Sequence, residues 1–373
     1  MTSPSLPTVG VDLRALVGSP SGVGFMTLAL LQRLAARGRA RYLGIAHRPT
    51  VADKELAEAG IELEHQAAPY GVLWQQLRLP HRLRRGDVDL FWSPLMTLPT
   101  RMPIPAVVTI HDLTPLLFPE THRLKVRLSV LPFLRSTLKQ ARLVAVDSEA
   151  TARDLRTHFP ASTKKLRVVH PGVDPAFRPA PRANIERTRL ELGCPQGYLL
   201  YAGTLEPRKN LESLLDAWEA LRASDADTPP LVMVGPYGWR SRRLLGRIER
   251  LARGGLSYLG RLPRERQVEV VQAASIFIYP SLYEGFGLPP AEAMACGLPV
   301  IVSNRSSLPE VVGEAGLQID PESAGDLASA IRRLLQQPTL ARELGEKAQA
   351  RSRRFDWDLS AQQMEEVLFE ALG

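Results

Sequence analysis

The stretch Tyr279-Pro-Ser-Leu-Tyr-Glu-Gly-Phe-Gly-Leu-Pro-Pro-Ala-Glu-Ala-Met-Ala-Cys-Gly-Leu-Pro-Val300 decides how the second half of this chain folds. The residues from Ser275 to Tyr279 are rich in β-branched and aromatic side chains, which indicates a short buried strand. Pro289 suits the first turn of a helix, where a backbone N–H has no partner, and Gly297 followed by Pro299 ends that helix. The sequence therefore predicts a strand, a glycine-rich loop and a short helix.

Such a loop is a place where an anion can bind. The first turn of a helix presents unpaired N–H groups and the positive end of the helix dipole, and Gly285 and Gly287 let a ligand approach the backbone. Glu284 in the loop and Glu292 in the helix would repel a phosphate, but they can accept hydrogen bonds from hydroxyl groups on either side of it. We expect a ligand in which hydroxyl-bearing groups flank a phosphate.

The spacing of Glu284 and Glu292, with seven residues between them, resembles the signature of retaining family 4 glycosyltransferases of the GT-B fold. The resemblance implies that Glu284 contacts the sugar of the donor and that Glu292 holds its ribose. It also implies that the loop backbone contacts the sugar and the diphosphate, through Gly285, Phe286, Gly287 and Leu288. The alternative is a loop and helix that only pack together in an ordinary α/β enzyme.

Size and composition are compatible with this interpretation. A chain of 373 residues is long enough for two domains, and a net charge of +8 suits a phosphorylated ligand, a nucleic acid or an anionic membrane surface. Cys194 and Cys296 are far apart and match no disulfide or metal pattern, which favours a reducing compartment. Because no signal peptide or membrane-spanning run is evident, we expect a cytoplasmic protein, at most peripheral to the membrane.

The first half also alternates between strands and helices. Val9–Arg14 reads as a strand, and Gly22 and Gly24 precede an apolar helical pattern. The dinucleotide-binding fingerprint is not met, because its third glycine position holds Thr27 and no acidic residue follows at the expected distance. The family resemblance implies that Gly22 and Gly24 face the donor phosphates.

His111 ends the predicted strand Ala106–Asp112, at the sheet edge where ligands of parallel α/β folds collect. A histidine in that place can simply be structural or capping. The resemblance implies that it lies against the donor sugar, and we therefore predict a role for His111 in the active site.

A basic segment covers residues 121–142, with six lysines and arginines and no acidic residue. Leucines recur through it with helical spacing, and Pro132 predicts one bent helix or two. Such a segment is either a solvated helix face or a contact with an anionic membrane. If the acceptor is lipid-linked, we expect the membrane contact here.

The proline-rich run Pro171–Pro181 is the best candidate for a linker. We predict a first Rossmann-like domain over residues 1–178, on the acceptor side, and a second over 179–356 that binds the nucleotide sugar. In the GT-B fold the two parallel-sheet domains face a cleft, and the resemblance implies that the last helix, in residues 357–373, crosses back to the first domain.

The second half begins with a strand that ends at Gly203, followed by a loop with Arg208 and Lys209 and by Asn210 as the expected N-cap of a helix. Two cations at a helix start suit a diphosphate. In the resembling family a lysine stands here and an arginine follows the glycine, where this chain has Thr204. We assign Gly203 and Thr204 to donor binding. We expect either that Arg208 supplies the second cation or that the diphosphate is bound more weakly than is usual in the family.

The backbone after the strand Leu256–Leu262 lies near the nucleotide base in the family, so Arg261 and Leu262 are candidates for base contacts. We expect a retaining transfer of a hexose, guessed as mannose, from a GDP- or UDP-linked donor to a sugar or lipid-linked acceptor in the synthesis of cell-surface polysaccharide or glycolipid. Lys209 and Arg208 should stabilise the leaving diphosphate, so that neither a metal nor a cofactor is expected. The catalytic residues predicted are His111, Arg208, Lys209 and Glu284.

Three other functions stay open at this point. An epimerase or hydrolase on the same fold would act on a nucleotide sugar without an acceptor. A nicotinamide-dependent oxidoreductase requires the fingerprint that the first loop lacks. A non-catalytic protein that binds nucleotides or nucleic acid is the third, but no basic platform interleaved with aromatic residues supports nucleic acid as a partner.

Overall fold

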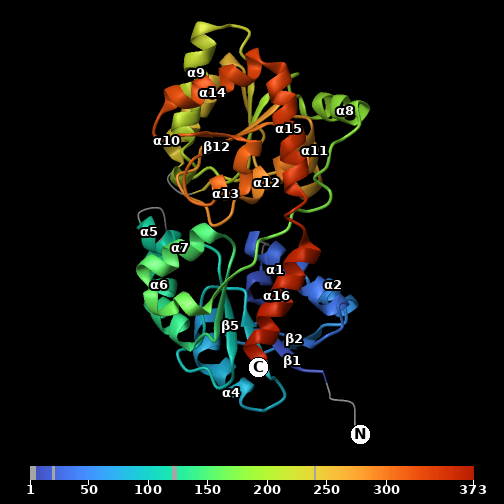
Figure 1. Ribbon diagram of the computed structural model, residues 1–373, viewed down its shortest axis with the longest axis vertical. Coiled ribbons are helices and arrows are strands. Elements are labelled where there is room, and N and C mark those ends of the chain that lie inside the picture. The colour runs from blue at the N-terminus through green and yellow to red at the C-terminus, as the bar shows by residue number, and fades with distance from the viewer. Residues whose placement is uncertain (1–5, 19–21, 120–123, 239–240) are drawn as a thin grey trace. The chain divides into compact units, whose positions relative to one another are not determined.

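The computed structural model describes residues 6–18, 22–119, 124–238 and 241–373 (Figure 1). The chain forms two compact units, of which the first holds residues up to Gly172 together with Asp356–Gly373, and the second holds Val173–Phe355. The first boundary therefore precedes the predicted position after residue 178, and the second lies one residue from the predicted one.

The first unit contains a seven-stranded sheet in the order β3-β2-β1-β4-β5-β6-β7. Every pairing between its described strands is parallel. The central strands are buried along their whole length, as expected for a sheet that helices cover on both faces. The strands are β1 (Thr8–Asp12), β2 (Arg41–Ala46), β3 (Glu62–His65), β4 (Leu90–Ser93), β5 (Ala106–Ile110), β6 (Leu143–Val146) and β7 (Leu166–Val168).

The larger helices of this unit are α1 (Gly22–Ala36), α2 (Asp53–Glu58), α6 (Leu124–Gln140), α7 (Glu149–His158) and α16 (Trp357–Leu372). The short ones are η1 (Leu13–Leu16), α3 (Gly71–Leu73), η2 (Trp74–Arg78), α4 (Leu79–Leu83), α5 (Thr114–Leu117) and η4 (Pro160–Lys165). The predicted strand Val9–Arg14 is too long, because the Asp12 side chain accepts a hydrogen bond from Arg14 N and starts the helical turn η1.

The basic segment forms one continuous helix, α6, with Pro132 inside it. Arg135 and Lys139 are exposed one turn apart, whereas Leu134 and Leu138 are buried. Residues 121–123 of the predicted segment lie outside the described residues. Among the described residues, no helix has both the length and the apolar character needed to cross a bilayer.

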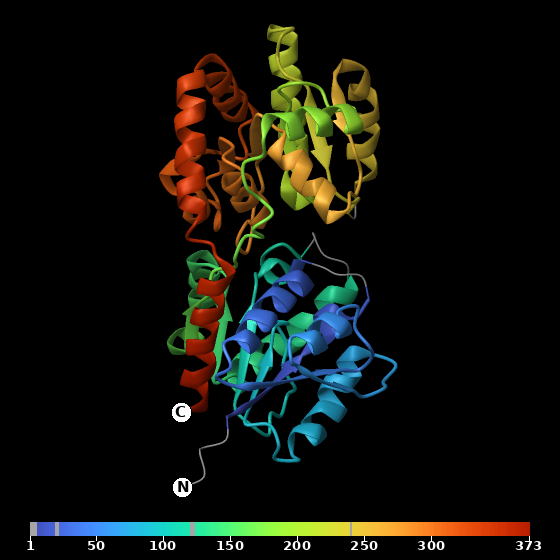
Figure 2. The same ribbon diagram turned by 90° about the vertical axis from the view of Figure 1, so that its right-hand side faces the viewer.

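The C-terminal helix α16 returns to the first unit, as predicted, and lies beside α1 (Figures 1 and 2). Asp356 caps its first turn by accepting hydrogen bonds from the backbone N–H groups of Asp358 and Leu359. Glu365, which is buried, accepts hydrogen bonds from Arg37 and Arg39, both at 3.0 Å. The helix is therefore tied to the turn that follows α1.

The second unit contains a six-stranded parallel sheet in the order β10-β9-β8-β11-β12-β13. Helices α9, α10 and α14 lie to one side of it, and α11 and α15 lie to the other (Figure 1). The strands are β8 (Leu199–Ala202), β9 (Leu231–Val234), β10 (Leu256–Tyr258), β11 (Ile276–Tyr279), β12 (Val300–Ser303) and β13 (Leu317–Ile319).

The helices of the second unit are α8 (Arg182–Leu192), η5 (Pro207–Lys209), α9 (Leu211–Ser224), α10 (Arg242–Leu251), η6 (Ala252–Gly254), α11 (Arg264–Gln272), α12 (Leu288–Ala295), α13 (Leu308–Val312), η7 (Gly313–Ala315), α14 (Ala324–Gln336) and α15 (Pro338–Ser352). Two parallel-sheet α/β units with a returning C-terminal helix confirm the predicted fold class.

Asn210 does not cap α9 in the predicted way. It occupies the N-cap position in a left-handed conformation, and its side chain accepts no capping hydrogen bond. Its amide instead donates to the carbonyl oxygens of Pro280 and Pro321, at 3.3 and 2.6 Å. The side chain therefore ties the loop after β8 to the loops after β11 and β13.

Candidate active site

The quoted stretch folds as predicted, with β11 leading through a loop into α12. Pro289 and Pro290 stand in the first turn of α12, and Gly287 precedes the helix with a φ of 112°. A Cβ atom on Gly287 would lie 2.8 Å from Leu308 Cδ2, so both the backbone conformation and the space require glycine. The loop can therefore turn tightly enough to start the helix at Leu288.

Glu284 lies at the centre of a buried charge cluster. Its Oε1 accepts hydrogen bonds from Lys209 Nζ at 2.6 Å and from Ser281 Oγ at 2.5 Å, and its Oε2 lies 3.1 Å from Arg208 Nη1. Burial alone would raise the pKa of Glu284, but the two cations and the hydrogen bonds lower it to about 2. The carboxylate is therefore ionised at neutral pH.

Lys209 is 6% exposed, which is unusual for an ammonium group. Its Nζ donates to Tyr279 Oη at 2.7 Å as well as to Glu284, and it lies 5.0 Å from the centre of the Tyr279 ring. Burial lowers the pKa of Lys209, an effect that Glu284 opposes. An ammonium group has three N–H donors, and the described residues supply acceptors for two of them.

Arg208 links the loop after β8 to the loop after β11. Its guanidinium pairs with Glu206 at 2.6 Å and with Glu284, and it donates to the carbonyl oxygen of Tyr283. The backbone carbonyl of Arg208 accepts a hydrogen bond from Leu282 N at 2.9 Å. Glu206 and Glu284 together balance the charges of Arg208 and Lys209, which is the counter-charge that two adjacent cations require.

Two serines after β12 form hydrogen bonds with the backbone of the loop between β11 and α12. Ser306 Oγ donates to Glu284 O at 2.5 Å and accepts from Glu284 N at 3.3 Å, and Ser307 Oγ donates to Phe286 O at 2.6 Å. Ser306 has a φ of 57°, a strained conformation for a residue other than glycine. The backbone of the candidate donor-binding loop is therefore fixed independently of any ligand.

Glu292 lies in α12, and its Oε1 accepts a hydrogen bond from Arg264 Nη2 at 2.6 Å. Burial raises the pKa of Glu292, and the pairing with Arg264 opposes this increase. Glu284 and Glu292 thus have different partners, since the first is neutralised by Lys209 and Arg208 and the second by Arg264.

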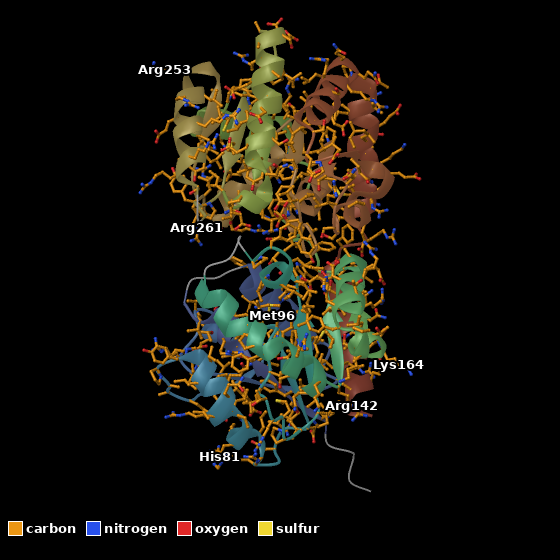
Figure 3. All side chains as sticks on the ribbon, turned by 90° about the vertical axis from the view of Figure 1, so that its left-hand side faces the viewer. His81, Met96, Arg142, Lys164, Arg253 and Arg261 are labelled. Atoms are coloured by element: carbon orange, nitrogen blue, oxygen red, sulfur yellow. The ribbon has the colours of Figure 1, made fainter. Side chains whose placement is uncertain are left out.

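The other predicted residues of the second unit lie at the same edge of the sheet. Gly203 follows β8, and Thr204 accepts a hydrogen bond from Tyr201 Oη through its carbonyl oxygen. Arg261 and Leu262 follow β10, with Arg261 exposed and Leu262 half-buried. Figure 3 labels Arg261, and also Arg253 in the helical turn that precedes β10. All of these residues therefore follow the carboxyl ends of parallel strands, where ligands bind in open α/β sheets.

The first unit holds Gly22, Gly24 and His111. Gly22 and Gly24 begin α1, and a Cβ atom on Gly24 would lie 2.7 Å from the Ala15 carbonyl oxygen, so that α1 can approach η1 this closely only with glycine there. The residues just before them, 19–21, lie outside the described ones.

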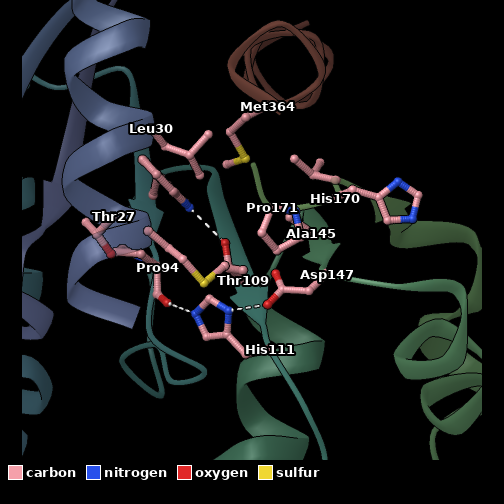
Figure 4. A pocket seen from close by; sticks show the side chains of 13 residues that line it. Thr27, Leu30, Pro94, Thr109, His111, Ala145, Asp147, His170, Pro171 and Met364 are labelled. Carbon is pink, nitrogen blue, oxygen red and sulfur yellow. Dashed lines mark hydrogen bonds and ion pairs between the residues drawn. The ribbon is translucent and has the colours of Figure 1, made fainter. Parts of the chain in front are cut away.

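His111 lines a small cavity together with Met26, Trp92, Asp147, Met364 and other residues of the first unit (Figure 4). Its Nδ1 lies 2.8 Å from Asp147 Oδ2 and its Nε2 lies 2.8 Å from Pro94 O. Burial alone would lower the pKa of His111, but Asp147 and the carbonyl group raise it to about 9. Both ring nitrogens therefore donate to protein acceptors, so that contact with a sugar would require the ring to exchange a partner.

Several residues that hold the site were not predicted from the sequence. Glu206, Tyr279 and Ser281 complete the charge cluster, and Ser306 and Arg264 hold the two glutamates. Tyr279 and Ser281 stand within the stretch quoted first, so their nearness to Glu284 was a usable signal. No such signal pointed to Ser306 or Arg264, because both are distant in sequence from the residues that they hold.

The sequence matches two family descriptions over most of its length. Residues 20–177 match Glycosyltransferase Family 4, and residues 185–351 match Glycosyl transferases group 1. O-antigen chain mannosyltransferase B of Escherichia coli is 31% identical over 360 residues, which cover 91% of this chain and 93% of that protein.

Solved structures share the fold across the whole chain. HepE of Anabaena, in complex with UDP and glucose, has a TM-score of 0.74 at 21% identity, covering 98% of this chain and 100% of that one. Sucrose-phosphate synthase of Thermosynechococcus elongatus has a TM-score of 0.76 at 25% identity, covering 98% of each chain. Together with the site in the second unit, these matches show that the chain belongs to the family 4 glycosyltransferases of the GT-B fold.

Proposed function

We propose that this glycosyltransferase moves a hexose, mannose in the first instance, from a nucleotide diphosphate sugar to an acceptor hydroxyl and retains the anomeric configuration. The observation that carries the proposal is the buried cluster of Lys209, Arg208 and Glu284 beside the loop that starts α12. Mannose is favoured because the Escherichia coli relative that matches 91% of the chain is a mannosyltransferase. The same relative supports a role in the synthesis of cell-surface polysaccharide.

The cations of the second unit would stabilise the leaving group. Departure of a nucleoside diphosphate builds negative charge, and the third N–H of Lys209 has no acceptor among the described residues. A phosphate oxygen can take that position, with further hydrogen bonds from the loop backbone at Gly287 and Leu288. Donors of this kind are typically worth about 10²–10³ in turnover each.

Glu284 would bind the sugar and would not act as a base or a nucleophile. A carboxylate with a pKa of about 2 is a poor proton acceptor at neutral pH, and both of its oxygens already face cations. Hydrogen bonds from sugar hydroxyls suit such a group. A retaining route without a covalent enzyme intermediate follows, in which a phosphate oxygen of the donor takes the proton of the acceptor hydroxyl on the same face.

The acceptor side is assigned to the first unit. Helix α6 exposes Arg135 and Lys139, which would attract an anionic membrane surface that carries a lipid-linked acceptor. Binding of the protein to vesicles with and without anionic lipid, in low and high salt, tests this part. Equal binding to both kinds of vesicle would contradict it.

Product analysis tests the proposed reaction. The purified protein is incubated with GDP-mannose or with UDP-glucose, each with and without a sugar acceptor, and the anomeric configuration of the product is read by NMR. We expect transfer with retention and little release of free sugar. Isomerised or free sugar formed equally without an acceptor would favour an epimerase or a hydrolase, and an inverted product would contradict the route above.

A further inference from the structure

Arg264, the first residue of α11, bridges three segments of the second unit. Its Nη2 donates to Glu292 Oε1 at 2.6 Å, and its Nε lies 3.4 Å from Asp174 Oδ2. Its guanidinium carbon lies 4.5 Å from the centre of the Phe177 ring. The side chain thus connects α12 to the segment with which the second unit begins.

These contacts fix the guanidinium on two sides. Phe177 is buried and provides a flat surface for the planar group, which is a favourable cation–π arrangement. Asp174 is itself held, because its Oδ1 accepts a hydrogen bond from Ala176 N at 2.9 Å. Arg264 is therefore held in place for Glu292 before any ligand binds. A lysine could not both stack on the Phe177 ring and pair with two carboxylates through separate N–H groups.

The two carboxylate oxygens of Glu292 have different surroundings. Oε1 is held by Arg264, whereas Oε2 accepts no hydrogen bond from any residue that the structure describes. Oε2 is not one of the fully buried polar atoms without a partner among the described residues. It is therefore accessible to a ligand and is not sealed in the core. The carboxyl group therefore presents one oriented oxygen to a ligand.

We propose that Arg264 is a positioning residue that holds Glu292 as the acceptor for a ribose hydroxyl, and that it thereby sets the preference of the site for ribonucleotides over deoxyribonucleotides. This inference rests on the proposed function, since it requires that a nucleoside diphosphate binds the second unit. Arg264 does not itself touch the sugar or the phosphate. Its effect passes through Glu292, whose tendency to become protonated on burial the guanidinium opposes.

Calorimetric titration with GDP, 2′-deoxyGDP and 3′-deoxyGDP, and with UDP and its deoxy analogues, tests the inference. A hydrogen bond to a charged acceptor predicts that the wild-type protein prefers the ribonucleotide by about 10–100-fold. Arg264→Met should reduce that preference about tenfold, and the affinity for the deoxynucleotide lacking the relevant hydroxyl should change less than about threefold. Arg264→Lys, which keeps a cation, should retain an intermediate preference.

Arg266→Met is the matched control. Arg266 lies on the same helix and also pairs with two carboxylates, Glu191 and Glu269, but it has no contact with Glu292. It should leave the preference unchanged. The double variant Arg264→Met with Glu292→Gln should prefer ribonucleotides over deoxyribonucleotides at least as strongly as Glu292→Gln alone, because the arginine acts only through that glutamate.

Three results would overturn the inference while leaving the proposed function intact. One is an unchanged ribonucleotide preference in Arg264→Met, and another is an equal loss of affinity for ribo- and deoxynucleotides. The third is a further loss of preference in the double variant. Failure of the wild-type protein to bind any of these nucleotides would instead overturn the proposed function, and this inference with it.

Discussion

At the scale of the residue, the site depends on charges that are buried but paired. Lys209, Arg208 and Glu284 were predicted from sequence to act in one place, and the structure brings them into contact. The role of Glu206 could not be predicted, because a sequence does not show which counter-charge faces a buried cation. The role of Ser306 could not be predicted either, because its positive φ is a property of the folded loop and a serine in the sequence does not indicate it.

Replacing Lys209 tests the cluster at its most buried cation. Lys209→Ala should lower kcat by about 10²–10³, because it would remove the proposed donor to the leaving diphosphate. Arg208 remains beside Glu284, so the fold should persist, which thermal unfolding can check. Lys164→Ala, at an exposed lysine in the first unit, is the control and should be neutral. Near-normal turnover of Lys209→Ala in a folded protein would remove the phosphate role.

His111 gives a prediction that depends on pH. Its pKa of about 9 lies above the ordinary value of 6.5, so its ion pair with Asp147 stabilises the fold fully below about pH 6.5 and loses this effect as the pH rises through 9. NMR titration of the imidazole protons should show a charged ring at pH 7.5. A midpoint at or below 6.5 would show that the ring is neutral and that one ring nitrogen is available to a ligand.

At the scale of the element, strand and helix positions followed from hydrophobic pattern and from glycine and proline. The unit β11, loop and α12 was predicted nearly to the residue because Gly287, Pro289 and Gly297 act locally. Asn210 was assigned the right position and the wrong hydrogen bonds, because its amide reaches Pro280 and Pro321, which the sequence does not place nearby. From the sequence, Pro132 allowed either one bent helix or two separate helices. The burial of Leu134 and Leu138 favours one continuous helix, which is what the structure has.

The attachment of α16 is testable through Glu365, which is 1% exposed and accepts hydrogen bonds from Arg37 and Arg39. Glu365→Gln should lower the free energy of unfolding of the first unit by about 1.5–3 kcal/mol, the usual contribution of hydrogen bonds to a charged group. Urea unfolding followed by circular dichroism would measure this. Glu366→Gln, at the exposed neighbouring position, should change little; equal effects of the two variants would show that the ion pair does not hold the helix.

At the scale of the whole molecule, sequence alone predicted two parallel-sheet units and the return of the last helix. That was feasible because alternating buried strands and helices allow few topologies, and because the signature of the second unit is local. The sugar, the base and the acceptor depend on the shape of a bound complex, and no single stretch of sequence determines them.

Metal dependence is a property of the whole enzyme that the cation cluster allows us to predict. If Lys209 and Arg208 balance the diphosphate, transfer should be unchanged after treatment with EDTA. The Asp-x-Asp triplet at residues 87–89 is already engaged, since Asp87 pairs with Arg82 at 2.6 Å and Asp89 accepts from Thr8 N at 2.8 Å. Loss of activity with EDTA and its recovery with Mg²⁺ or Mn²⁺ would contradict the argument.

The central claim is that the second unit binds a diphosphate between its buried cations and the start of α12, with Glu292 on the ribose. A crystal structure with bound GDP tests it most directly. We expect phosphate oxygens within hydrogen-bonding distance of Lys209 Nζ and of the backbone at Gly287 or Leu288, and a ribose hydroxyl on Glu292. A nucleotide bound elsewhere, with Lys209 still turned only to Tyr279 and Glu284, would contradict it.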